Sequence, residues 1–151
     1  FNSQPLRVTY VRSDEARATL VDALAAGNRA KTASAPLVAV LSYDTAWQDQ
    51  WDAFLPGYNA PKAMYDAAPD LAAATGNNNA HLQAGYFILA VRTLGLAAGP
   101  MTGADFAKID AAFFPDGSQK SFLVVNIGQP GADAWGEAKP KFAYEDVVRT
   151  V

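Results

Sequence analysis

The residues best suited to hold an electron-rich ligand form a polar turn, Gly99-Pro100-Met101-Thr102-Gly103. We expect an apolar helix before this turn, which ends near Leu94 and is closed by Gly95. A second helix is expected from Ala104 to about Phe114. A glycine-containing turn that leads into a helix presents free backbone N–H groups and the positive end of the helix dipole. Such a place can bind phosphate oxygens or the acceptor nitrogens of a cofactor ring.

A second polar group lies in Gly27-Asn28-Arg29-Ala30-Lys31, which we place just after the C-terminus of a helix. Asn28 and Lys31 are one helical turn apart, so an amide and an ammonium group can converge on one acceptor. A lysine in that position would stabilise negative charge near N1 and O2 of a reduced flavin. The alternative is a solvated helix end, where a cation interacts favourably with the dipole. Read together with the turn, the pair favours a flavin site.

Two further cations, Lys139 and Lys141, flank Pro140. In an extended segment they project to the same side, because side chains repeat every second residue. Two ammonium groups suit a phosphate. The alternative is an ordinary basic patch on the surface.

The remaining candidates for chemistry lack support in the sequence. His81 has no obvious partner for general-base work and is more typical of a helix surface or an interface. Ser3 and Ser42 are unsupported as nucleophiles. Aromatic side chains can wall a substrate pocket, but at helical spacing they are more often core; these are Trp47, Trp51, Phe54 and Tyr58. We therefore assign no catalytic side chain and no metal ligand.

Composition limits the class of protein. The chain has 151 residues, is 50% hydrophobic and carries a net charge of −3, which predicts one domain with an ordinary core. Its pI of about 5.0 argues against nucleic acid or an anionic membrane as a partner. Without cysteine, disulfides and thiolate chemistry are excluded. No basic-then-apolar leader is visible, so we expect a cytoplasmic location. The chain opens on Phe1, and we expect residues to be missing upstream.

Hydrophobic patterning predicts strands at residues 7–11, 36–43 and 121–127. The second is a continuous apolar run, as expected of a strand covered on both faces. Strands separated by helices indicate layers of sheet and helix, in an α+β or α/β arrangement.

Helices are predicted from a Ser13 cap through Ala26, with Gly27 just past the end, and from a Thr45 cap through Phe54. Residues 56–69 read as a lid-like excursion with at most a short helix. The helix that begins near residue 70 or 77 and ends near 94 is so apolar that it must be central, or buried by a second subunit. After residue 130 we expect a loop, then an edge strand or a short helix over residues 142–151.

Taken in order, several segments are similar to those of the FMN-dependent nitroreductase family, and within it to the malonic semialdehyde reductase branch. No segment is decisive alone, but the ordered set spans nearly the whole chain. The segments are Asn2-Ser3-Gln4-Pro5, Gly27-Asn28-Arg29-Ala30-Lys31-Thr32, Ala35-Pro36, Leu82-Gln83-Ala84-Gly85-Tyr86, Leu94-Gly95-Leu96, Gly99-Pro100-Met101-Thr102-Gly103 and Lys139-Pro140-Lys141.

The resemblance implies an α+β three-layer sandwich, with a central, mostly antiparallel sheet flanked by helices. It also implies a homodimer with FMN at the subunit interface, reduced by NADH or NADPH. Hydride would pass through the flavin to a small aldehyde resembling malonic semialdehyde. A broad nitroaromatic or quinone reductase, or a non-catalytic flavin-binding module, is the alternative. Residues 1–151 would form a single nitroreductase-like domain that lacks the family's N-terminal helical segment with its arginine-rich phosphate clamp.

The resemblance also assigns residues to the cofactor. Asn28 and Lys31 match contacts to the pyrimidine end of the flavin. The backbone of Thr102 and Gly103 matches the donor to flavin N5, and Met101 would lie against the ring. The remaining matches are listed by role: Lys139 and Lys141 for the phosphate, Asn2 for a contact from the partner subunit, and Tyr86 and Phe87 for the dimer core. Apart from these matches, a carboxylate on the acceptor would need an arginine, and Arg29 is the candidate for it.

Overall fold

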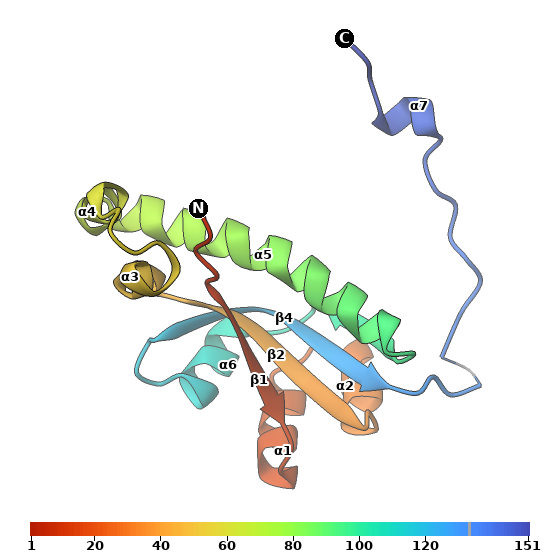
Figure 1. Ribbon diagram of the computed structural model, residues 1–151. Helices are drawn as coiled ribbons and strands as arrows, with labels where there is room; N and C mark the ends of the chain where they lie inside the picture. Colours follow the sequence, from red (N-terminus) through yellow and green to blue (C-terminus); the bar gives the residue numbers. More distant parts are fainter. Residues whose placement is uncertain (133) are drawn as a thin grey trace.

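The computed structural model describes residues 1–132 and 134–151 and shows three layers (Figure 1). The middle layer is an antiparallel sheet with the strand order β1-β2-β4-β3. Helix α5 crosses one face of this sheet, and α1, α2 and α6 cover the other. The strands are β1 (Leu6–Val11), β2 (Leu37–Asp44), β3 (Ala97–Met101) and β4 (Gln119–Gly128). The helices of these layers are α1 (Asp14–Asp22), α2 (Ala26–Ala33), α5 (Pro69–Thr93) and α6 (Phe106–Phe113). The predicted α+β sandwich is confirmed.

The two central strands, β2 and β4, supply both cores. Val38 and Val40 are fully buried against α1, α2 and α6, together with Val124 of β4. The alternate residues Ala39 and Leu41 face α5 on the opposite side. The apolar run in β2 is therefore explained by two covered faces, as the sequence predicts.

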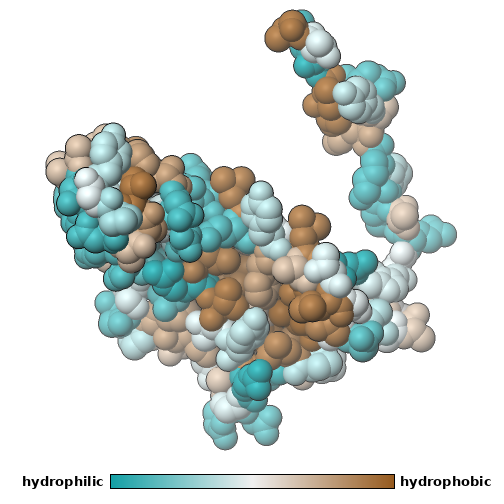
Figure 2. All heavy atoms as spheres, viewed as in Figure 1, coloured by the Kyte–Doolittle hydropathy of each residue, from teal (hydrophilic) through white to brown (hydrophobic). Residues whose placement is uncertain are grey.

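Helix α5 packs on the sheet mainly through small side chains. Its buried residues are Ala72, Gly76, Ala80, Ala84 and Val91. The opposite face exposes large apolar side chains: Leu82 is 67%, Tyr86 75% and Leu89 63% exposed. Figure 2 shows apolar residues at the surface on this side of the molecule. Among the described residues, no helix combines the length and apolar character that crossing a membrane requires.

The first helix is shorter than predicted. Ser13 caps α1 as expected, because its side chain accepts a hydrogen bond from the Ala16 N–H. The helix ends at Asp22 instead of Ala26, since Leu24 forms a bridge with Ala104. The segment from Gly27 to Lys31 therefore does not follow a helix C-terminus but lies inside α2.

The polar turn is also shorter than predicted. Gly99, Pro100 and Met101 belong to β3, an edge strand, where a proline is tolerated. This strand was missed because its sequence, Ala-Ala-Gly-Pro-Met, has low β-propensity and is held by pairing with β4. Only the residues from Thr102 to Asp105 remain as a connection to α6.

The predicted helix over residues 45–54 is wrong as a single element. It divides into a 3₁₀ turn, η1 (Trp47–Gln50), and α3 (Trp51–Phe54). The Thr45 hydroxyl donates to the Gly117 carbonyl instead of capping a helix. Trp47 and Trp51 are 1% and 0% exposed, so they are core rather than walls of a pocket. The following excursion holds one short helix, α4 (Ala60–Ala67), as predicted.

The structure also decides between the alternatives for His81 and for residues 142–151. His81 is exposed on α5, where its ring stacks on Phe122 with centroids 4.1 Å apart. The C-terminal segment forms a short helix, α7 (Tyr144–Val147), and no edge strand. Figure 1 shows this segment standing away from the sheet and its helices.

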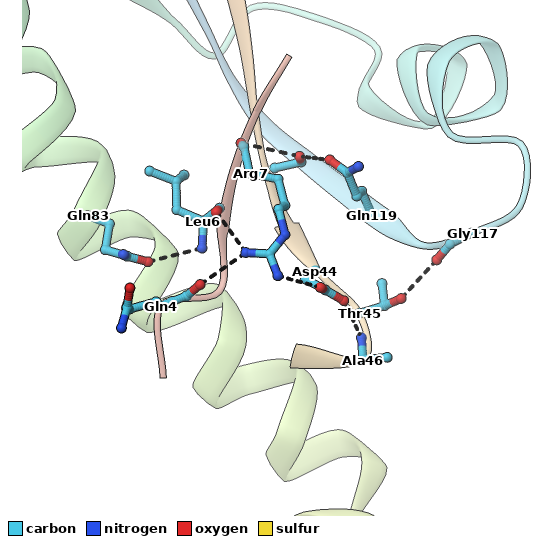
Figure 3. Close-up of polar contacts among 10 residues, drawn as sticks. Gln4, Leu6, Arg7, Asp44, Thr45, Ala46, Gln83, Gly117 and Gln119 are labelled. Carbon is cyan, nitrogen blue, oxygen red and sulfur yellow. Dashed lines mark hydrogen bonds and ion pairs between the residues drawn. The ribbon is translucent and has the colours of Figure 1, made fainter. Parts of the chain in front are cut away.

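Polar contacts tie β1 to its neighbours (Figure 3). Arg7 of β1 forms an ion pair with Asp44 of β2 at 2.6 Å. Gln83 of α5 accepts a hydrogen bond from the Leu6 N–H at 3.0 Å. The long helix is thereby fixed in register over the sheet edge by a directional contact as well as by packing.

Replacing Gly76 by alanine tests the close packing of α5. A Cβ at Gly76 would lie 2.8 Å from the Trp47 ring, so we expect Gly76→Ala to lower the free energy of unfolding by about 1–3 kcal/mol. At Gly85, on the same helix, a Cβ meets nothing within 4 Å. Gly85→Ala is therefore the matched control and should stabilise by up to about 1 kcal/mol. Urea unfolding measures both variants; equal losses would contradict the packing argument.

Candidate functional site at helix α2 and the 102–105 turn

Helix α2 carries the predicted pair and is held at both ends by arginines. Arg17 donates to the carbonyl of Thr32 in the last turn of the helix at 2.9 Å and to that of Ala35, just past its end, at 2.7 Å. Arg29 donates from Nε to the Leu24 carbonyl at 2.8 Å, just before the first turn. Asn28 and Lys31 are therefore presented by a short helix whose position relative to α1 is fixed.

Asn28 joins α2 to the turn that follows β3. Its Nδ2 donates to the Gly103 carbonyl at 3.0 Å, and the Ala25 N–H donates to the same oxygen at 3.0 Å. A Cβ at Gly103 would lie 2.7 Å from Asn28 Nδ2, so a larger residue would displace the Asn28 amide from the Gly103 carbonyl. The structure thus brings together Asn28, Thr102 and Gly103, as predicted for one site. The amide nitrogen of Asn28 is engaged by the protein itself.

The turn offers hydrogen-bond donors. Among residues 1–132 and 134–151, no acceptor is found for the backbone N–H of Thr102 or of Gly103. Both residues are exposed. The predicted contribution of the helix dipole is wrong in detail, because α6 begins only at Phe106 and the Asp105 carboxylate already caps it. The two free N–H groups are therefore the chemically useful part of the turn.

An open cavity of about 580 Å³ lies between α2, the first residues of β3 and the end of β4, and the residues of the turn do not line it. Lys31 of α2 and Gly99 of β3 line it, and Asn126 of β4 lines the same space. The remaining lining residues are mostly small, with Trp135 from the segment after β4. The Asn126 Oδ1 atom is buried and has no hydrogen-bond partner within the described part of the chain. The cavity is therefore lined by one cation, Lys31, and by an amide, Asn126, whose buried oxygen has no hydrogen-bond donor among the described residues.

Met101 lies beneath the cavity rather than at its surface. It is only 6% exposed and packs in the core with Leu24 and Val124. Its sulfur accepts hydrogen bonds from Thr32 Oγ1 at 3.8 Å and from Asn126 Nδ2 at 4.0 Å. The last residue of β3 is thus attached both to α2 and to β4.

A second hollow, of about 480 Å³, includes Thr102 and Gly103 together with several charged residues. Lys108 forms an ion pair with Asp22 there, and the Lys108 hydrogen bond lowers the pKa of the Asp22 carboxyl. Arg29 also lines this hollow. Two of its guanidinium nitrogens already bond to the carbonyls of Leu24 and Asp22 at 2.8 and 3.3 Å. The geometry gives Arg29 a structural role at the end of α1.

Three predicted site residues are not brought to Lys31 within one chain. Lys139 and Lys141 are exposed in the C-terminal segment, which Figure 1 shows apart from the body of the molecule. Asn2 instead lines a hollow of about 120 Å³ beside α5, with Asn79 and Gln83. These residues can join the site only from another position of the segment or from a second chain.

Sequence reasoning missed Thr32 and Asn126. The signal for Asn126 is visible in retrospect, since it is the one polar residue in the otherwise apolar run Phe122-Leu123-Val124-Val125-Asn126-Ile127. A buried amide in such a strand needs a partner. Thr32 gives no comparable signal, because a threonine in a short helix is unremarkable.

Comparison with known proteins places the chain in a family. Residues 1–129 match the nitroreductase family. A protein of Streptomyces coelicolor, provisionally named NADH dehydrogenase/NAD(P)H nitroreductase, is 48% identical over the whole chain and 76% of its own length. A protein of the same name from Streptomyces griseus is 46% identical, with the same coverage of 100% and 76%.

The fold is also found among solved structures. A provisionally assigned nitroreductase from Exiguobacterium sibiricum, in complex with FMN, superposes with a TM-score of 0.84 at 21% identity. The match covers 98% of this chain and 77% of that one. On the family match and the identity to full-length relatives, the chain belongs to the nitroreductase family.

Proposed function

We propose that the protein is an FMN-dependent oxidoreductase that uses NADH or NADPH as the electron donor. The observation that carries the proposal is the joined pair of binding elements. Lys31 lines a cavity of about 580 Å³, and the free N–H groups of Thr102 and Gly103 are held to the same helix by Asn28. Relatives named NAD(P)H nitroreductases and the FMN complex of a neighbour support it.

The residues present fit a flavin. Its ring has acceptor atoms at N1, O2, O4 and N5, and a donor at the N3–H. The protein offers matching groups: an ammonium at Lys31, backbone donors at Thr102 and Gly103, and an unpartnered buried acceptor at Asn126. A buried polar atom without a partner is costly, and a rotation of the Asn126 amide toward the cavity would let a ligand donor relieve that cost. Asn28, Lys31, Met101, Thr102 and Gly103 thus remain the predicted flavin residues, with Asn126 added.

The roles of the protein groups follow from charge and position. FMN, held by these residues, would supply the hydride-transfer chemistry between a nicotinamide donor and an acceptor. Lys31 stabilises the negative charge that the pyrimidine end of the ring gains on reduction. The rigid turn orients the ring through Thr102. No side chain serves as a nucleophile, which agrees with the absence of a supported candidate in the sequence.

The assembly we propose is a homodimer with the flavin at its interface. The large apolar side chains on the outer face of α5 need a cover, and a second copy of the same face supplies one. The C-terminal segment also exposes apolar residues, with Phe142 82% and Tyr144 74% exposed. In such a dimer Lys139 and Lys141 can approach the phosphate, and Asn2 can contact the cofactor of the partner.

For the acceptor we propose a small aldehyde of the malonic semialdehyde type, on the branch resemblance. Arg29 does not support this choice, since its guanidinium is engaged with α1. A broad nitroaromatic or quinone reductase is the second candidate. It is favoured by the lining of the cavity, in which Lys31 is the only charged side chain among the residues described.

The purified protein tests the enzyme directly. It should be yellow or become yellow with added FMN, lose the colour on addition of NADPH or NADH, and regain it with an acceptor. Steady-state rates with malonic semialdehyde, a nitroaromatic and a quinone then rank the acceptors. Protein that stays colourless with FMN would overturn the proposal, and bound FMN without NAD(P)H bleaching would indicate a non-catalytic flavin-binding module.

Replacing Lys31 tests its electrostatic role. Lys31→Met should lower the flavin midpoint potential by about 30–60 mV, equivalent to about 1.4–2.8 kcal/mol, because the charge that stabilises the reduced ring is lost. Lys62→Met is the control, since Lys62 pairs with Asp66 on α4 and does not line the cavity. Spectroelectrochemical titration gives both potentials. An unchanged potential in Lys31→Met would remove Lys31 from the site.

A charge on the outer face of α5 tests the dimer. Tyr86→Glu should shift the protein from dimer to monomer, because a carboxylate would be buried at the proposed interface without a partner. Met64→Glu is the control on α4, where the side chain is 46% exposed. Sedimentation velocity reports the mass of each variant. A wild-type monomer at micromolar concentration would exclude the proposed assembly.

A further inference from the structure

We propose that Thr32 and Asn126 are positioning residues that hold the sulfur of Met101 and so fix the Thr102 N–H relative to Lys31. The expected effect on FMN rests on the proposed function. The contacts to the Met101 sulfur do not depend on that function. Neither residue belongs to the set that the family resemblance assigns to the cofactor.

The sulfur of Met101 is held from two sides. Thr32 is fully buried, and its hydroxyl donates to Met101 Sδ at 3.8 Å. A helical threonine more often returns its hydroxyl hydrogen to a carbonyl of the preceding turn. Asn126 donates from Nδ2 to the same sulfur at 4.0 Å. A methionine has three flexible side-chain torsions, and two donors on its sulfur remove much of that freedom.

Stability of the fold alone does not account for Asn126. Its Oδ1 is buried without a partner, and an apolar side chain of similar size would avoid that penalty. Val124, two residues away on the same face of β4, and Val38, opposite Asn126 on β2, are fully buried apolar residues, so an apolar residue would suit this position. The amide is explained if its nitrogen holds Met101 and its oxygen, which has almost no accessible surface without a ligand, turns toward the cavity that Asn126 lines when a ligand donor binds there.

Helix α2 binds the turn at two points one helical turn apart. Asn28 and Thr32 are four residues apart and share a face of the helix. Asn28 holds the Gly103 carbonyl and Thr32 holds the Met101 sulfur. Thr102 lies between these two attachments, with its N–H free. Because Lys31 is on the same helix, α2 carries both the lysine and two of the attachments that hold the turn, and Asn126 of β4 adds the third.

The consequence concerns the two ends of a bound flavin. The Thr102 N–H would donate to N5 of the oxidised ring, which is a bare acceptor, and not to the reduced ring, where N5 carries hydrogen. Losing the position of this donor therefore weakens the oxidised state in particular. A variant that loosens Met101 should raise the midpoint potential, whereas a simple loss of core packing would not shift it.

Thr32→Val tests the attachment, since valine keeps the shape and removes the donor. We expect the amide NMR signals of Thr102 and Gly103 to shift with and without FMN. We also expect FMN to bind about threefold to tenfold more weakly, the factor for one hydrogen bond, with a higher midpoint potential. Thr32→Ser should restore both properties. Thr19→Val is the control, because Thr19 is exposed on α1 and bonds only to the Glu15 carbonyl.

Met101→Leu supplies a second route if Thr32→Val does not fold. It removes the sulfur with little change of volume. The double variant with Thr32→Val should lose no more affinity than Met101→Leu alone, because Met101→Leu already removes the contact that Thr32→Val breaks. Unchanged Thr102 and Gly103 signals in the folded variants, or additive losses, would overturn the inference. If wild-type protein binds no FMN, the proposed function fails. The Thr102 and Gly103 amide signals of the variants without FMN still test whether Thr32 and Met101 position the turn.

Discussion

The hydrogen bond from Asn28 to the Gly103 carbonyl is the contact on which the candidate site depends. It joins a helix and a turn that are 75 residues apart in sequence, and it requires a position without a Cβ. The edge strand β3 cannot hold its own end in place, since it pairs with β4 on one side only. The Asn28 contact and the sulfur of Met101 together supply the missing restraint. A ligand therefore meets donors whose positions are already determined, and little ordering has to accompany binding.

Small residues also allow close packing between the long helix α5 and the elements beneath it. The inner face of α5 is mainly alanine and glycine, so its backbone can approach its neighbours closely, and the Trp47 ring of η1 packs directly against Gly76. The large side chains are left to the opposite face. The helix thus has two apolar faces. The inner face carries small side chains and packs on the sheet, and the outer face carries large side chains that can interdigitate with those of another helix. This division accounts for the high apolar content of α5 without requiring that the helix be central in a single chain.

Sequence patterning predicted the elements that carry strong periodic or capping signals. The strands β1, β2 and β4, the Ser13 cap and the long helix all belong to this group, because each is specified by local residues. It failed where tertiary contacts decide. β3 has weak intrinsic β-propensity and exists through pairing, and α1 stops early because Leu24 bridges to Ala104. For the site, Asn28 and the turn were found together, but the turn's boundaries were not. Thr32 and Asn126 acquire their roles only through one methionine sulfur, which no spacing rule reveals.

The extended C-terminal segment has a consequence for how such a protein behaves in dilute solution. Its two lysines lie away from the chain's own cavity, so under the proposed assembly each cofactor is gripped by groups from separate polypeptides. Cofactor retention then follows the law of mass action for association of the chains as well as for the ligand. Dilution below the dissociation constant of the dimer would release the cofactor as the chains separate, and excess cofactor would in turn favour association of the chains.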